Sequence, residues 1–287
     1  MRKRDALYII FAVVLVFGLI FSHFGGRIFN KTEDRAESGI LAVHFQDVGN
    51  ADSVFIQLPD GKIALIDGAE RENAKDIIDY IESLGTTKID YLIATHPHSD
   101  HIGGLAEIID ALDVSMVFMP DAVHTTSEFE DMINSIEKKN IPVTKAEDKL
   151  VLFEGEGYKA ECLSPSGEYD NLNDYSIVIK LTYKNKSFLF MGDAEKTVEK
   201  ELVENYGYAL RSDVLKVGHH GSDTSSCKEF LEAVNPKIGV ISVGKGNDYG
   251  HPHKEVIKRL ERYGIEILRT DKTGTVVLKT DGFDWRE

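Results

Sequence analysis

His96-Pro97-His98-Ser99-Asp100-His101 contains three imidazoles and one carboxylate within six residues. The stretch follows an apolar run at 90–95 that predicts a buried strand, and it opens a segment at 101–112 that predicts a helix. Imidazole nitrogens bind transition metals, and carboxylate oxygens are harder ligands. Side chains two residues apart on extended chain point to one side, so His96 and His98 can bind one ion. Asp100 and His101 can reach a second ion. The sequence therefore predicts a metal site here rather than a solvated polar loop.

The order His-x-His-x-Asp-His, with a strand before it and a helix after it, resembles the signature of the metallo-β-lactamase superfamily. The resemblance implies an α/β fold, an αββα four-layer sandwich whose two β-sheets hold two divalent metal ions, Zn or Mn. It also implies a hydrolase in which these ions activate water. His96 and His98 would bind the first ion. Asp100 and His101 would bind the second, with Asp100 as a catalytic residue as well as a ligand.

The same resemblance gives roles to other polar residues that follow predicted strands. Asp67 would support the histidine loop from beneath, since such outer partners orient metal ligands. Asp193, in a Met-Gly-Asp motif, would bridge both ions; its alternative is a turn aspartate that caps the helix predicted at 196–206. His219 would complete the set of ligands of the second ion. His220 is the alternative ligand, because adjacent side chains on extended backbone point in opposite directions and only one is expected to bind.

The sequence departs from the general family pattern between Asp110 and Asp193. A further histidine is usual there, but the only one present is His124, in a predicted polar loop. The expected position falls at Asn173 instead. The first ion would then be held by the two leading histidines of the signature and the bridging aspartate alone. This predicts two sites of unequal affinity and makes manganese a candidate beside zinc.

Several further motifs resemble the hydrolase domain of the ComEC type of DNA-uptake protein, over about residues 39–281. These motifs are Phe45-x-Asp47-Val-Gly-Asn-Ala-Asp-Ser53, Asn173-x-x-Ser176, Gly192-Asp193, Lys216-Val-Gly-His-His-Gly-Ser222-x-x-Ser225, Ser242-Val-Gly and Tyr249-Gly-His-Pro-His253. The sequence differs at Gly49-Asn50-Ala51, where Gly-Gln-Gly is usual. One hydrophobic segment also cannot form a multi-pass channel, so the uptake function does not follow from the resemblance.

These motifs add candidates that would contact the substrate or support the ligands: Asp47, Asn173, His220, Ser222 and His251. His253 is expected to act as a general acid or to contact a leaving phosphate, because it precedes a helix N-terminus, which favours anions. The alternative is that His251-Pro252-His253 is only a turn that caps the helix at 254–263. The sequence contains no Gly-x-Ser-x-Gly elbow and no phosphate-binding P-loop.

The N-terminus reads as a membrane segment. Three basic residues precede an apolar run at 6–21. A transmembrane helix needs about 20 apolar residues, whereas a signal peptide has a shorter run and a small-residue cleavage site. We expect residues 1–24 to be an uncleaved signal anchor, 25–38 a tether and 39–287 the hydrolase domain. A cleaved secretory signal and a buried core helix are the alternatives. The basic flank predicts a single-pass protein whose domain lies outside the cell membrane.

Composition limits the functions that this domain can have. The formal net charge is −15, and it is −18 without residues 1–36, so the body repels phosphate backbones and high-affinity non-specific nucleic-acid binding is not expected. Bound metal ions can reverse that sign locally, so a nucleic-acid substrate is still compatible. The two cysteines, Cys162 and Cys227, have no metal-site spacing and read as free thiols or a single disulfide.

Three hypotheses follow. The first is a phosphodiesterase or nuclease that acts outside the membrane through a metal-activated water. The second is a hydrolase of a cell-envelope component, such as a teichoic-acid phosphodiester or a lactam. The third is a non-catalytic metal-binding module on the membrane.

Overall fold

Two β-sheets pack face to face in this protein, whose computed structural model describes residues 37–286. The first sheet is formed, in spatial order, by β17 (Trp285–Arg286), β16 (Val276–Thr280), β1 (Leu41–Phe45), β2 (Val54–Gln57), β3 (Ile63–Ile66), β5 (Tyr91–Ile93), β7 (Val117–Met119) and β8 (Val143–Lys145). The second is formed by β15 (Glu266–Arg269), β14 (Ile238–Ile241), β13 (Val214–Lys216), β12 (Lys186–Phe190), β11 (Val178–Tyr183), β10 (Tyr158–Ser164) and β9 (Val151–Gly155).

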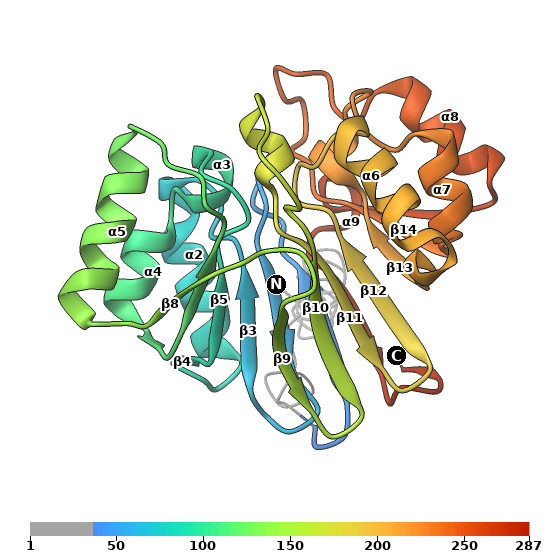
Figure 1. The fold of residues 1–287 in the computed structure, drawn as a ribbon. Helices are drawn as coiled ribbons and strands as arrows, with labels where there is room; N and C mark the ends of the chain where they lie inside the picture. Colours follow the sequence, from blue (N-terminus) through green and yellow to red (C-terminus); the bar gives the residue numbers. More distant parts are fainter. Residues whose placement is uncertain (1–36, 287) are drawn as a thin grey trace, which may run out of the picture. The chain divides into compact units, whose positions relative to one another are not determined.

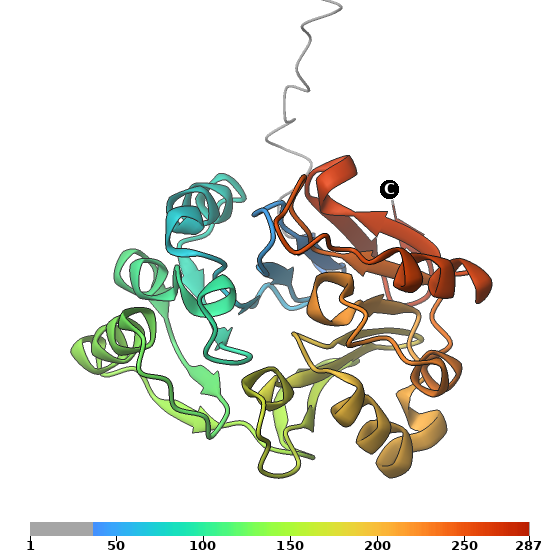
Figure 2. The ribbon, with the colours of Figure 1, turned by 90° about the horizontal axis from the view of Figure 1, so that it is seen from above.

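Helices cover the outer face of each sheet (Figure 1, Figure 2). The first sheet packs against α2 (Ala74–Ser83), α4 (Leu105–Ala111) and α5 (Ser127–Lys139). The second packs against α6 (Lys196–Tyr206), α7 (Lys228–Val234) and α8 (Lys254–Arg262). The described residues therefore form the αββα order of layers that the resemblance implied.

Three apolar cores hold these layers together. The central core lies between the sheets, where β3 is buried along its whole length and accordingly reads as a continuous apolar run. Phe45 and Phe190 meet across it with ring centroids 6.0 Å apart. The outer cores are formed by the apolar stripes of the helices, for example Ile77 and Ile81 of α2.

Parallel strands gather polar residues at one edge of the sandwich. Strands β3, β5 and β7 are parallel, as are β12, β13, β14 and β15. The carboxyl ends of parallel strands meet at one edge, where open α/β sheets commonly bind ligands. The chain leaves β5 shortly before His96, β12 shortly before Asp193 and β13 shortly before His219.

The strand expected at 90–95 and the helices expected at 196–206 and 254–263 are confirmed as β5, α6 and α8 to within two residues at each end, but the helix expected at 101–112 is interrupted. It forms α3 (Ser99–Ile102) and α4, with Gly103 and Gly104 between them. A Cβ on Gly104 would lie 2.4 Å from the carbonyl oxygen of Gly68, and one on Gly103 would lie 2.8 Å from the backbone nitrogen of Arg71. The glycines therefore let this segment press against the loop after β3.

The predicted signal anchor at 1–24 and most of the predicted tether at 25–38 lie outside the described residues. Within residues 37–286, no helix combines the length and the apolar character needed to cross a bilayer.

Candidate metal centre

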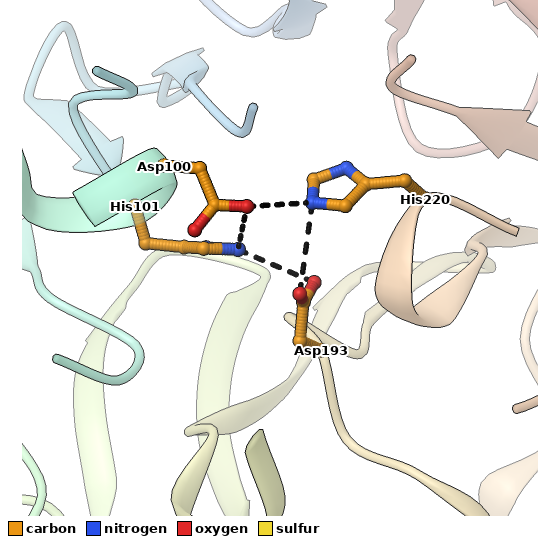
Figure 3. Close-up of side chains that lie close together, drawn as sticks. All are labelled: Asp100, His101, Asp193 and His220. Carbon is orange, nitrogen blue, oxygen red and sulfur yellow. Dashed lines mark ion pairs between the residues drawn. The ribbon is translucent and has the colours of Figure 1, made fainter. Parts of the chain in front are cut away.

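Four side chains from both halves of the sandwich converge at this edge (Figure 3). Asp100 and His101 come from α3, Asp193 from the loop after β12, and His220 from the short 3-10 turn η4 (Gly218–Gly221). His101 Nε2 lies 3.3 Å from Asp193 Oδ1, and His220 Nε2 lies 3.3 Å from Asp100 Oδ2 and 3.6 Å from Asp193 Oδ2. One ligand atom from each of the four lies within 4.8 Å of all the others.

These residues fit a divalent metal ion. His101 Nε2, His220 Nε2 and Asp193 Oδ1 are buried and have no hydrogen-bond partner. Buried polar atoms almost always have one, because leaving them unpaired costs about 1–3 kcal/mol each. All three face the same point, and a nitrogen and carboxylate donor set suits first-row divalent ions. A cation at this point would satisfy every one of them.

The electrostatics of the cluster also favour positive charge. Burial opposes the charged form of His101, but Asp193, Asp67 and Asp100 raise its pKa well above the usual range. Burial likewise opposes the charged form of His220, and Asp193 and Asp100 raise its pKa. Burial opposes the ionised form of Asp193, yet His220 and His101 hold its pKa well below the usual range. The carboxylates of the cluster therefore favour positive charge at its buried histidines.

His96 and His98 form a second half of the site. His96 Nε2 lies 3.0 Å from His98 Nδ1, and the rings of His96 and His101 are 4.1 Å apart. Burial lowers the pKa of His96 well below the usual range, with the nearby His101 adding to the effect. Neutral imidazole is the form that binds metals. The two nitrogens are hydrogen-bonded to each other beside the four-residue cluster, so the structure brings the residues predicted for both ions into one region.

Hydrogen bonds behind the ligands fix which nitrogen faces the site. Asp67 is fully buried and accepts the Thr95 N–H at 2.8 Å and the Thr95 hydroxyl at 2.7 Å. Its Oδ2 also accepts from His101 Nδ1 at 2.7 Å, which leaves Nε2 of that ring free for a metal. His220 Nδ1 donates to the Ser242 carbonyl at 3.0 Å, with the same consequence. Asp67 thus lies where the sequence predicted a supporting residue.

Four supporting residues were not singled out from the sequence. The Ser176 hydroxyl accepts the N–H of Asp193 at 3.0 Å and lies 3.3 Å from His96 Nδ1, so it links the two halves of the site. Lys216 is buried, forms an ion pair with Asp52 and donates to the Gly192 carbonyl at 3.2 Å. Ser176, Lys216 and Asp52 lay within the quoted motifs, and that was their only signal. Thr95, the fourth, ended a predicted strand.

The structure places His220, rather than the favoured His219, inside the four-residue cluster. Both residues have left-handed backbone conformations, with φ of 49° and 50°. The expected alternation of side chains applies to extended backbone, so it does not apply in this turn. His219 still faces the site: its Nε2 lies 3.7 Å from Asp193 Oδ2, and its Nδ1 lies 3.1 Å from a carboxylate oxygen of Glu195.

The other predicted site residues divide into those that line a cleft above the cluster and those that do not. The cleft has a volume of about 330 Å³. It is lined by Asn50, His98, Ser99, Asp100, His124, Thr126, Asn173, Asp193, His219, His220, Tyr249 and His251. Asn173 and His251 are therefore at the site, as expected. A larger cavity of about 530 Å³, lined by residues that include Asp121 and Tyr175, shares none of these residues.

Asp47, Ser222 and His253 do not line this cleft. Asp47 is exposed and donates its N–H to Thr275 Oγ1. The Ser222 hydroxyl is buried against Thr224 Oγ1, 3.0 Å away. His253 Nδ1 accepts the N–H of Asp223 at 2.9 Å, so this ring fastens the turn before α8. The role of general acid predicted for His253 is therefore not supported by its position, and His251 is the histidine of this turn that faces the cleft.

Residues 47–245 match the sequence profile of the metallo-β-lactamase superfamily. The chain belongs to this superfamily. Its members are mostly hydrolases, and with the clustered His and Asp ligands the class of activity supported here is metal-dependent hydrolysis. Cys162 and Cys227 are free and buried, so the first of the two alternatives for the cysteines is confirmed.

ComEC-type proteins are among the chain's relatives in this superfamily. It is 30% identical over 248 residues to ComE operon protein 3 of Bacillus subtilis, which covers 80% of this chain and 32% of that protein. It is also 30% identical over 237 residues to competence protein ComA of Neisseria gonorrhoeae, covering 82% of this chain and 32% of that protein. The chain thus spans about a third of the length of these relatives.

Solved structures show the same fold at low sequence identity. CmlA, a diiron β-hydroxylase from Streptomyces venezuelae, matches with a TM-score of 0.57 and 17% identity over 84% of this chain and 54% of that chain. Igni18, a metallo hydrolase from Ignicoccus hospitalis, matches with a TM-score of 0.55 and 15% identity over 83% of this chain and 98% of that chain. At these identities the likeness concerns the fold alone.

Proposed function

We propose that this protein is a phosphodiesterase that cleaves nucleic acid with two divalent ions, Zn or Mn. The observation that carries the proposal is the cluster of His and Asp ligands at the cleft. Its Asp193 Oδ1, His101 Nε2 and His220 Nε2 atoms are buried and have no hydrogen-bond partner. When bound, two such ions lower the pKa of a bound water and stabilise the attacking and leaving oxygens of a phosphodiester. The likeness to ComEC-type proteins favours nucleic acid as the substrate.

The chain's own residues would position the substrate. His219 Nδ1 lies 3.1 Å from both Glu195 and Thr224, which would hold the ring with Nε2 toward the cluster; there, a ring that carries both protons can donate to a non-bridging phosphate oxygen. The side chain of Asp100 is 27% exposed and lies at the floor of the cleft, where one carboxylate oxygen can accept the proton of the attacking water. Asn173 donates to Glu195 at 3.3 Å and so supports the carboxylate that holds His219.

The proposed setting is outside the cell membrane, with residues 1–24 as the anchor. This part of the proposal rests on the apolar run and its basic flank alone. A cysteine-substituted surface position, labelled in intact cells with an impermeant reagent, tests it. Labelling only after lysis would contradict it.

The activity is tested with the purified full-length chain, first measured for metal content and then loaded with Zn or Mn. Hydrolysis of bis-p-nitrophenyl phosphate and of a single-stranded oligonucleotide is expected to fall by at least about 100-fold in Asp193→Ala and His101→Ala. Asp110→Ala is the matched control, because this carboxylate lies on the outer helix α4 and forms an exposed ion pair with Lys138. A chain that takes up no metal would leave both hydrolase hypotheses without support. Unchanged hydrolysis in Asp193→Ala would refute the assignment of the site.

A further inference from the structure

Three rings form a nearly parallel row from the metal cluster to the lip of the cleft. His220 and His251 are tilted by 24° with centroids 6.3 Å apart, and His251 and Tyr249 are tilted by 21° with centroids 5.6 Å apart. All three line the cleft. His220 is buried at the cluster, whereas Tyr249 is 70% exposed. The row therefore presents an open aromatic face one ring away from the cleft floor.

The loop that carries Tyr249 is fixed at its base. The Asn247 side chain donates to the carbonyls of Gly244 at 2.9 Å and His251 at 2.7 Å, and it accepts the His251 N–H at 3.0 Å. Gly246 and Gly250 on either side have φ of 70° and 74°, a conformation that other residues rarely adopt. These hydrogen bonds and glycines hold the turn so that Tyr249 projects from it. The ring of Tyr249 is exposed, so packing in the core does not explain its position.

The walls of the cleft offer little to a polyanion. None of the lining residues is a lysine or an arginine, and the described body of the chain is acidic. A phosphate next to the scissile one would find no cationic partner there. Affinity for a nucleic acid would then come from the base, since an aromatic ring stacks an unpaired base of any sequence. A base within a duplex has both faces covered already.

We propose that Tyr249 and His251 form a stacking platform for the unpaired base beside the scissile phosphate, so that the enzyme prefers single-stranded nucleic acid to phosphodiesters without bases. This inference rests on the proposed function and sharpens its substrate. A polyol-phosphate polymer of the cell envelope lacks the flat ring that such a platform would hold. A preference for substrates that carry bases would therefore favour the nuclease hypothesis over the hypothesis of a cell-envelope hydrolase.

The test compares a tetrathymidylate with the same backbone carrying abasic tetrahydrofuran units, both followed by chromatography with the metal-loaded full chain. Tyr249→Ala is expected to lower kcat/KM for the tetrathymidylate by about 5- to 150-fold, mainly through KM, and to leave the abasic substrate nearly unchanged. Tyr249→Phe keeps the ring and is expected to retain most of the activity. Tyr208→Ala is the matched control, because Tyr208 is 82% exposed and lies outside the cleft. Equal losses on both substrates, no loss on either, or a wild-type preference for the abasic backbone would overturn the platform.

A binding measurement tests the platform separately from the proposed activity. Thymidine 5′-phosphate and deoxyribose 5-phosphate are titrated into the metal-loaded wild-type and Tyr249→Ala proteins by calorimetry. Tighter binding of the thymidine compound that is lost in the variant supports the platform even if no phosphodiester is cleaved, and in that case only the proposed activity fails. If oligonucleotides are cleaved but the thymidine base strengthens binding equally in the wild-type and Tyr249→Ala proteins, the proposed activity stands and the platform is refuted.

Discussion

Replacing Asp67 with asparagine should weaken metal binding without any change in the ligands themselves. Asp67 Oδ2 accepts from His101 Nδ1 at 2.7 Å, and Oδ1 accepts the Thr95 N–H at 2.8 Å. In Asp67→Asn the amide oxygen can keep the Thr95 bond, which places the NH₂ group against His101. That group donates, so it favours the tautomer of His101 with the proton on Nε2, the atom that faces the cluster. The ligand is then blocked by its own proton.

The expected size of the effect follows from this geometry. Loss of one outer partner of a metal-bound histidine typically costs about 10–100-fold in metal affinity, or about 1.4–2.7 kcal/mol. The metal-free variant should lose a similar amount of stability, about 1–3 kcal/mol, because a buried hydrogen bond to a carboxylate is replaced. Competition with a chromogenic chelator gives the first quantity, and urea unfolding in excess chelator gives the second.

A matched control separates metal binding from folding. Asp213 also accepts a backbone N–H, from Ser187 at 3.0 Å, but it lies at the opposite end of β13 from the cluster. Asp213→Asn should lower the free energy of unfolding and leave metal affinity within about twofold of the wild type. Wild-type metal affinity in Asp67→Asn, or an equal loss of affinity in Asp213→Asn, would show that Asp67 does not orient His101 for metal binding.

Four further predictions concern the same site and the core. His220→Ala should lose at least one equivalent of metal, measured by elemental analysis, because His220 is in the four-residue cluster. His219 is not in that cluster, so His219→Ala should keep its metal and lose activity. Equal metal loss in both variants would contradict this. Burial opposes charge on His101 and His220, but the neighbouring carboxylates raise the pKa of both rings. Metal binding near pH 7 should therefore release protons and weaken as the pH falls. Calorimetry in buffers of different ionisation enthalpy measures the number of protons released. A raised histidine pKa stabilises the fold when the ring is protonated, so the metal-free protein should lose stability as the pH rises through these pKa values; stability that rises instead would refute the link. Burial raises the pKa of the Cys162 and Cys227 thiols to about 12, so neither should react with a disulfide reagent at pH 8 until the protein is unfolded.

The elements with an unbroken apolar core were the ones that the sequence predicted well. Strand β3 is buried at every position, and it consists of four apolar residues in succession, a pattern typical of a buried strand. Three of the strands that were missed, β8, β9 and β15, lie at the edges of their sheets and contain few or no buried residues. Their apolar signal is weak because only part of each strand meets the core.

At the site, local motifs were predictable and long-range partners were not. The histidine run and Asp193 stand in recognisable patterns, so their types and spacing were enough to place them at one site. Asp52 and Lys216 are paired across the sheets, and neither has a neighbour in the sequence that indicates the other. His219 and His220 could not be ranked, because the left-handed turn that redirects both side chains depends on how Gly221 and the chain around it pack against Pro252.

The excess of acidic groups at this edge explains why the fold and the metal should be coupled. Asp52, Asp67, Asp100 and Asp193 surround the cluster, and Lys216 is the one basic side chain among the contacts described for them. Buried charge without compensation is costly, and in the absence of metal the protons on His101 and His220 have to supply it. The ligands come from α3 beside the first sheet and from the loops after β12 and β13 of the second. A metal bound there would therefore add a further link between the two sheets, beside the Ile177 N–H bond to the Thr95 carbonyl and the Lys216–Asp52 ion pair.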